Sequence, residues 1–133
     1  MSHPNRDLLT SIYHAFGRGD MEPVMASLAD DIDWRVYGPS PVAGHYRGKD
    51  AVLEFFPKMM AQYDGTLRVE VTATVADEHD GFVKVRESAD RPAEVAYAGV
   101  HVWGFQDGKC TRFESYYDDV YAGFWASQSS AEA

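Results

Sequence analysis

Glu87 and His101 are the ionisable side chains that strand alternation places on an inward, mostly apolar face of this chain. Tyr97 is expected between them on the neighbouring strand. A carboxylate and an imidazole held together in this way could pass a proton between two positions of a bound carbonyl compound. Tyr97 or Tyr117 would then donate a hydrogen bond to the developing oxyanion. The alternative interpretation is that Glu87 and His101 only satisfy one another in a hydrated cavity.

Three predicted strands in the second half of the chain position these side chains. Alternating apolar and polar residues place them at residues 82–89, 94–105 and 110–117. A turn centred on Arg91 would join the first two and set Glu87 opposite Val95. An earlier strand at residues 67–75 shows the same alternation. The second half of the chain is therefore predicted to form an antiparallel sheet.

The turn at Asp107-Gly108 decides which face of the last strand points inward. A three-residue loop with a glycine bulge would set His101 opposite Ser115 and turn Ser115 inward. A two-residue loop would shift the last strand by one residue and bring Glu114 inward instead. We adopt the first register, and both interpretations remain open at this point.

The inward face combines large aromatic residues with a few polar groups, which is typical of a small-molecule cavity. Trp34 and Trp103 could stack on a planar ligand or serve only as core. His45, in a loop, is expected to be solvated, although it could reach the mouth of the cavity. The predicted ligand-lining residues are Trp34, Val36, Phe55, Met59, Val85, Trp103, Phe113, Ser115 and Tyr117.

The first half of the chain is predicted to be largely helical. Apolar residues recur at helical spacing from Leu8 to Phe16, and shorter patterns follow Asp20 and Gly48. One strand is expected at 32–37, followed by a loop. Helices first and strands afterwards indicate an α+β fold, in which a curved antiparallel sheet packs against three N-terminal helices and encloses one pocket. We predict a single domain over residues 1–133, with a core at 5–125 and a frayed tail at 126–133.

Composition excludes several classes of partner. The chain has 133 residues, of which 45% are hydrophobic, and its net charge is −9. This negative charge disfavours binding to nucleic acid or to an anionic membrane surface. The single cysteine, Cys110, suits a reducing compartment, and no apolar leader is visible, so the cytoplasm is expected. Histidines at metal-ligand spacing are missing, and we expect neither a metal nor a cofactor.

Several short motifs, in this order, resemble the nuclear transport factor 2-like superfamily, with the SnoaL-like and ketosteroid isomerase-related proteins most similar. The resemblance extends over about residues 5–125 and implies a cone-shaped, cystatin-like α+β fold. Members include isomerases, cyclases, epoxide hydrolases and non-catalytic binders, so the fold alone does not define a reaction. The motifs are Arg18-Gly19-Asp20, Leu28-Ala29-Asp30-Asp31, Trp34, Ala43-Gly44-His45-Tyr46-Arg47-Gly48, Val100-His101-Val102-Trp103 and Asp107-Gly108-Lys109.

The catalytic patterns implied by the resemblance are only partly present. The carboxylate base of ketosteroid isomerases would fall at Val36, which cannot accept a proton. Their tyrosine would fall at Ile12, with Tyr13 one residue away. The two acids of epoxide hydrolases are replaced by Ser88 and Ser115.

The cyclase pattern is matched in one residue. His101 fits the histidine of SnoaL-like cyclases, whose acidic base on the last strand has only Asp118, or Glu114 in the other register, as a counterpart. The sequence therefore predicts a small-molecule protein with possible isomerase or cyclase-type proton transfer, and Glu87, His101 and Tyr97 are the catalytic candidates. The alternatives are a non-catalytic binder of a small apolar molecule and a protein-interaction module.

The outer face of the predicted sheet carries Val100, Val102 and Tyr116 among charged residues. This mixture is typical of a sheet-to-sheet contact, and dimers are usual in the superfamily that the chain resembles. We therefore predict a homodimer through the sheet face.

Overall fold

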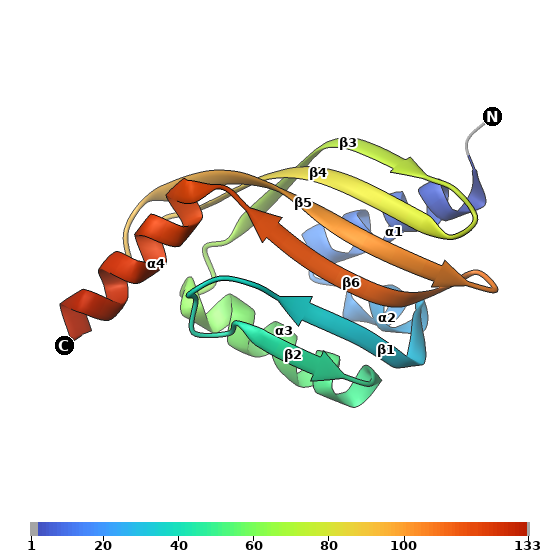
Figure 1. Ribbon diagram of the computed structural model, residues 1–133, viewed down its shortest axis with the longest axis horizontal. Coiled ribbons are helices and arrows are strands. Elements are labelled where there is room, and N and C mark those ends of the chain that lie inside the picture. Colours follow the sequence, from blue (N-terminus) through green and yellow to red (C-terminus); the bar gives the residue numbers. More distant parts are fainter. Residues whose placement is uncertain (1–2, 133) are drawn as a thin grey trace.

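The computed structural model describes residues 3–132, with side chains described through residue 128. It has the predicted α+β arrangement, with helices packed on one face of a curved sheet (Figure 1). The helices are α1 (Pro4–Gly17), α2 (Met21–Ala26), α3 (Lys49–Gln62) and α4 (Asp119–Glu132). The strands are β1 (Leu28–Val36), β2 (Gly44–Arg47), β3 (Arg68–Ala76), β4 (Asp80–Ala89), β5 (Val95–Gln106) and β6 (Lys109–Tyr117).

The sheet is mixed rather than fully antiparallel, which corrects the prediction. Its strand order is β2-β1-β6-β5-β4-β3, and β1 runs parallel to β6 while every other pair is antiparallel. The short strand β2, predicted to be part of a loop, forms a hairpin with β1 and takes its outer edge. The other edge of β1 pairs with β6, the last strand along the chain.

Three helices cover the concave face of the sheet (Figure 1). Helix α1 begins after His3, whose ring Nδ1 accepts a hydrogen bond from the Asn5 backbone N–H at 3.1 Å. Its buried side, which includes Leu9 and Ile12, packs against β3 and β4. Helix α3 contacts β1 and β2 and buries Phe55. The main hydrophobic core lies between these helices and the sheet.

The β5–β6 hairpin has the predicted register, but the length of its loop and the position of its bulge differ from the prediction. Its loop has two residues, Asp107 and Gly108, whose φ angles are 52° and 77°. Two successive positive φ angles are what a type I′ hairpin turn requires. A β-bulge between Gly104 and Phe105 then shifts the ladder, and His101 lies opposite Ser115 as predicted.

The β4–β5 register differs from the prediction by two residues. Glu87 lies opposite Tyr97 instead of Val95. Because side chains alternate with a period of two, this error leaves every residue on its predicted face. It also makes Glu87 and Tyr97 direct cross-strand neighbours, which the predicted register did not.

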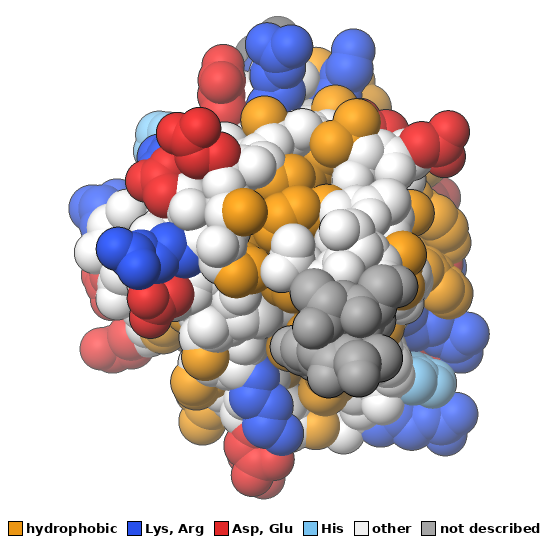
Figure 2. Space-filling model, turned by 90° about the vertical axis from the view of Figure 1, so that its left-hand side faces the viewer, with side chains coloured by type: hydrophobic (Ala, Val, Ile, Leu, Met, Phe, Trp, Pro, Cys, Tyr) orange, Lys and Arg blue, Asp and Glu red, His pale blue; other side chains and the backbone are white. Residues whose placement is uncertain are grey.

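The fraying predicted for residues 126–133 stays a prediction, and residue 133 lies outside the described residues. Residues 126–132 continue α4, which lies at one end of the sheet (Figure 1). Tyr121 and Trp125 anchor this helix in a second hydrophobic cluster with Tyr63, Ala89 and Tyr97. Seen from this end, apolar side chains gather near the centre and charged groups stand around the margin (Figure 2).

The outer face of the sheet exposes Phe82, Val100 and Tyr116. The predicted homodimer through this face stays a prediction. Within residues 3–132, the helices are too short or too polar to cross a membrane. In the same range, His, Cys, Asp and Glu side chains form no group of three or more that could hold a metal ion.

Candidate functional site

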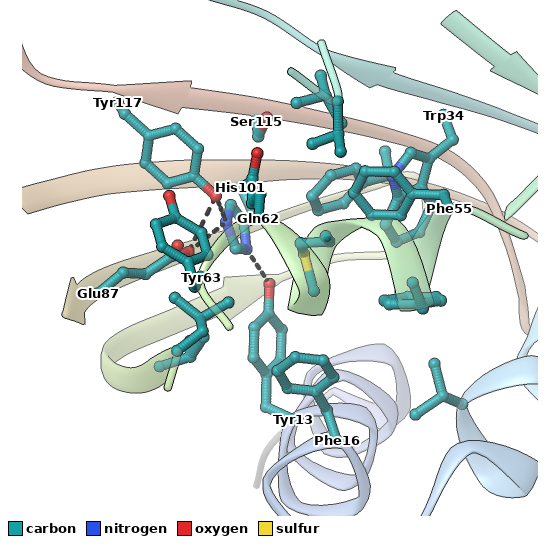
Figure 3. Close-up of a pocket in the computed structure, with 18 of the residues that line it drawn as sticks. Tyr13, Phe16, Trp34, Phe55, Gln62, Tyr63, Glu87, His101, Ser115 and Tyr117 are labelled. Atoms are coloured by element: carbon teal, nitrogen blue, oxygen red, sulfur yellow. Dashed lines mark hydrogen bonds and ion pairs between the residues drawn. The ribbon is translucent and has the colours of Figure 1, made fainter. Parts of the chain in front are cut away.

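A largely apolar cavity lies between the concave face of the sheet and helices α1 and α3 (Figure 3). The space between its side chains, with the open mouth included, is about 710 Å³. Aromatic rings form much of its wall, and Trp34 stacks on Phe113 with ring centroids 3.9 Å apart. Its lining includes Ile12, Tyr13, Phe16, Trp34, Val36, Phe55, Phe56, Met59, Gln62, Tyr63, Glu87, Tyr97, His101, Trp103, Phe113, Ser115, Tyr117 and Tyr121.

The Glu87 carboxylate is buried and accepts hydrogen bonds at both oxygens. Tyr97 Oη donates to Oε1 at 2.9 Å, and Tyr117 Oη donates to Oε2 at 2.9 Å. His101 Nε2 lies 3.3 Å from Oε2. A carboxylate can be buried in this way because charged acceptors form strong hydrogen bonds with several donors at once.

His101 connects Glu87 to helix α1. Its Nε2 lies 2.9 Å from Tyr117 Oη, and its Nδ1 is hydrogen bonded to Tyr13 Oη (Figure 3). Trp103 Nε1 donates to Tyr13 Oη at 3.2 Å. The imidazole is buried and has polar partners at both nitrogens.

One arrangement of protons satisfies all of these contacts. The carboxylate of Glu87 can only accept, so Tyr97 and Tyr117 each give it their single proton. Tyr117 Oη must then accept from His101 Nε2–H. With a neutral imidazole, Nδ1 is then the acceptor for the Tyr13 hydroxyl.

A second series of hydrogen bonds leads from helix α4 to Glu87. Trp125 Nε1 donates to Tyr63 Oη at 3.2 Å, and Tyr63 Oη lies 2.7 Å from Tyr97 Oη. Because Tyr97 gives its proton to Glu87, Tyr63 is the donor in that contact. Both series of hydrogen bonds therefore end at the Glu87 carboxylate. The positive ends of several bond dipoles thus point toward its negative charge.

Gly99 on β5 makes room for the ring of Tyr117. A Cβ atom at this position would collide with the backbone oxygen of Tyr116 and with the ring of Tyr117. Tyr117 lies opposite Gly99 in the β5–β6 ladder, and its hydroxyl crosses β5 to reach Glu87 on β4. The site therefore requires glycine at residue 99, because a larger residue would collide with Tyr117.

Gly99→Ala is expected to destabilise the protein by about 1–3 kcal/mol, the usual cost of overpacking a filled site. The collision involves backbone atoms of β6, which cannot move away without breaking the ladder. Chemical denaturation of the variant measures the change. Gly123→Ala is the control, because a Cβ there meets nothing within 4 Å. Equal stability of both variants would contradict the role assigned to Gly99.

Burial keeps the tyrosines of the site protonated. Loss of hydration raises the pKa of Tyr13, Tyr97 and Tyr117 well above the ordinary value of 10.0, and the negative charge of Glu87 raises the pKa of Tyr97 and Tyr117 further. Burial also raises the pKa of Tyr63 and Tyr121. At neutral pH these groups are hydrogen-bond donors, not phenolates.

These shifts predict sensitivity to alkali. A folded-state pKa above the unfolded value of about 10 stabilises the protein fully below pH 10, and this stabilisation is lost as the pH rises further. We expect the tyrosinate absorbance of the buried tyrosines to appear together with loss of the near-ultraviolet circular dichroism. The denaturant-unfolded chain should ionise near pH 10. Ionisation of all tyrosines near pH 10 with the native spectrum retained would contradict this account.

The structure gathers most of the predicted site residues around one cavity. Glu87, His101 and Tyr97 meet there, and their catalytic roles stay predictions. Val85 does not line the cavity; it is fully buried in the main hydrophobic cluster, where α1 packs over β4. The predicted lining residues that do border the cavity are Trp34, Val36, Phe55, Met59, Trp103, Phe113, Ser115 and Tyr117.

Sequence reasoning missed three polar members of the site. Tyr13 lies within the apolar pattern from Leu8 to Phe16, and its place one residue from the tyrosine position of the isomerase pattern was the available signal. Tyr63 and Gln62 lie at the end of α3, where no pattern indicated a role. His45 lies outside the cavity lining and contacts Asp33 on the neighbouring strand.

Comparison with known proteins places the chain among small proteins of this fold. The SnoaL-like domain family matches residues 9–113. An uncharacterized protein of Mycobacterium tuberculosis (strain ATCC 25618 / H37Rv) is 31% identical over 127 residues, covering 90% of this chain and 95% of the relative.

Two solved structures show how widely the fold extends. An NTF2-like protein of unknown function from Burkholderia pseudomallei K96243 superposes with a TM-score of 0.79 at 26% identity, covering 89% of this chain and 92% of that chain. A putative SnoaL-like polyketide cyclase from Jannaschia sp. CCS1 has a TM-score of 0.74 at 13% identity, covering 89% and 88%. The second likeness shows the fold alone.

Proposed function

The chain belongs to the SnoaL-like domain family, and on this premise we propose that its cavity binds a small, largely apolar carbonyl compound and transfers a proton on it. The observation that carries the proposal is the hydrogen-bonded series Tyr13–His101–Tyr117–Glu87 in the wall of an apolar cavity. It combines a proton acceptor, a proton relay and a balancing charge, which are the parts that general acid–base catalysis needs.

In the proposed reaction Tyr13 faces the substrate. Its oxygen takes a proton from the carbon next to the carbonyl group while its own proton passes to Nδ1 of His101. The products are a bound enolate and an imidazolium, whose positive charge is balanced by Glu87 through the Nε2 contact at 3.3 Å. The proton returns by the same path, to the same carbon or to another one.

This assignment changes the role expected for Tyr97 and Tyr117. Both hydroxyl protons are already given to Glu87, so neither is free for a developing oxyanion. In our proposal these tyrosines are positioning residues that hold the carboxylate. The group that meets the substrate is Tyr13, which lies one residue after the tyrosine position of the isomerase pattern.

Deuterium exchange tests the proposal without knowledge of the natural substrate. 1-Tetralone, an aryl ketone with exchangeable hydrogens next to its carbonyl group, is incubated with the protein in deuterated buffer. We expect these hydrogens to exchange faster than in buffer alone, as followed by proton NMR. Saturable binding of 1-tetralone with exchange at the buffer rate would contradict catalysis.

That result would favour the second candidate, a non-catalytic binder of a small apolar molecule. One observation supports this alternative: Glu87 and His101 already have hydrogen-bond partners within the protein. A binder needs no group that exchanges protons with its ligand. Release of an unchanged ligand after prolonged incubation, detected by mass spectrometry, would distinguish it from the enzyme.

A further inference from the structure

The cavity has a second polar region, separate from the series that ends at Glu87. Ser115 Oγ, Trp34 Nε1 and Gln62 Oε1 are buried atoms with no hydrogen-bond partner among the described residues. All three residues line the cavity. Ser115 is 1% exposed and Trp34 is 3% exposed, whereas Gln62 is only half-buried. Ser115 and Trp34 are therefore the two residues whose unpartnered atoms lie deep in the protein.

Unpartnered polar atoms are informative because buried polar groups in folded proteins nearly always have a partner. The indole N–H of Trp34 can only donate, and the hydroxyl of Ser115 can donate or accept. The two other tryptophans differ, since Trp103 Nε1 donates to Tyr13 and Trp125 Nε1 donates to Tyr63. Of these three indole groups, that of Trp34 alone has no acceptor among the described residues.

The sheet register places these donors on the side of the cavity next to His101. Ser115 on β6 is the direct neighbour of His101 on β5 and of Val36 on β1. Trp34 lies two residues before Val36, on the same face, where its ring stacks on Phe113. Figure 3 shows Ser115 beside His101 and Trp34 farther along the same wall. A flat molecule in the cavity can thus meet Tyr13 and these donors together.

We propose that Ser115 and Trp34 donate hydrogen bonds to oxygen atoms of the bound molecule and so select oxygenated ring compounds over hydrocarbons of the same shape. This inference rests on the proposed function and deepens it. Ser115 binds the carbonyl oxygen beside the carbon that faces Tyr13. Trp34 binds an oxygen farther along the ring system, and where the molecule has only one oxygen, as 1-tetralone does, Trp34 donates to that oxygen together with Ser115. Both are specificity-determining residues that exchange no proton with the substrate.

Two matched probes test the inference: 1-tetralone and tetralin, which has the same ring skeleton without the oxygen. Each hydrogen bond contributes about 2- to 10-fold in affinity. We therefore expect wild-type protein to bind 1-tetralone about tenfold more tightly than tetralin in calorimetric titrations. In ¹H–¹⁵N NMR spectra, 1-tetralone should shift the indole N–H signal of Trp34 more than those of Trp103 and Trp125.

The variants are Ser115→Ala, Trp34→Phe and the double variant. At least one single variant should lower the preference for 1-tetralone, and the double variant should reduce it to about one. Unchanged binding of tetralin shows that the cavity is intact in each variant. Ser88→Ala is the control, because this serine lies outside the cavity lining and accepts a hydrogen bond from Arg68.

The outcomes separate this inference from the proposed function. Equal binding of both probes by the wild type, or a full preference in the double variant, overturns the role of Ser115 and Trp34 but leaves the cavity as a binding site. If neither probe shifts the signals of residues that line the cavity, both the inference and the proposed function fail.

Discussion

Glu87→Ala is expected to lower the free energy of unfolding by about 3–5 kcal/mol, the usual loss when one partner of a buried charged network is removed. This carboxylate accepts hydrogen bonds from Tyr97 and Tyr117, and His101 Nε2 lies 3.3 Å from it. Without it, the two hydroxyl protons have no acceptor in a cavity that excludes much of the solvent. Thermal and chemical denaturation, followed by circular dichroism, measure the loss.

Two further variants show whether the effect belongs to the carboxylate. Glu87→Gln keeps the size and one acceptor oxygen, so its cost should be smaller, about 1–3 kcal/mol. Glu94→Ala removes an exposed glutamate just before β5 and should change stability by less than about 0.5 kcal/mol. If Glu87→Ala were as stable as Glu94→Ala, the convergence of donors on Glu87 would have no energetic weight.

Tyr13→Phe and His101→Ala should each slow the exchange of 1-tetralone hydrogens by about 100- to 10,000-fold, the usual contribution of a positioned acid or base. Phenylalanine keeps the ring of Tyr13 but removes the oxygen that passes the proton. Alanine at residue 101 removes Nδ1, which receives it. Proton NMR of the ketone in deuterated buffer measures both rates.

Binding and kinetics together distinguish lost chemistry from lost structure. Tyr13→Phe should still bind 1-tetralone within a few-fold of the wild type, because the cavity wall keeps its shape. Tyr37→Phe, which changes a half-exposed tyrosine outside the cavity, is the control and should exchange at the wild-type rate. Wild-type exchange in Tyr13→Phe would mean that the proton follows another path.

The inward face of the sheet was predictable because strand alternation is tolerant of some errors. Glu87 was placed opposite Val95 rather than Tyr97, yet an error of two residues leaves the same side chains facing the cavity. An error of one residue would have exchanged the faces. The β5–β6 hairpin came close to this, since its two-residue loop alone would have turned Ser115 outward.

The bulge in that hairpin was not predictable from the local sequence. The extra residue is Thr111 on β6, because Phe105 pairs with Cys110 and Gly104 pairs with Arg112, and strand alternation does not indicate where such an extra residue falls. The parallel pairing of β1 with β6 has a similar origin. It joins the first and the last strand of the chain, so no local turn fixes their direction or register, and the four residues of β2 are too few to be recognised as a strand by alternation.

The contribution of the helices to the site was the part that sequence analysis could not give. Helical spacing identified the apolar stripe that contains Tyr13, but the angle at which α1 crosses the sheet decides which hydroxyl reaches His101. Tyr63, the residue after α3, and Trp125 on α4 likewise join the site through a hydrogen bond between segments far apart in the sequence. These contacts are non-local, and no residue pattern within either helix encodes them.

The most direct test of the whole account is a crystal structure of the protein with 1-tetralone. The account predicts that the ketone lies in the cavity, with its reactive carbon next to Tyr13 Oη and its oxygen within hydrogen-bond distance of Ser115 Oγ or Trp34 Nε1. A ketone bound on the outer face of the sheet, or bound in the cavity with its oxygen turned away from both donors, would contradict it.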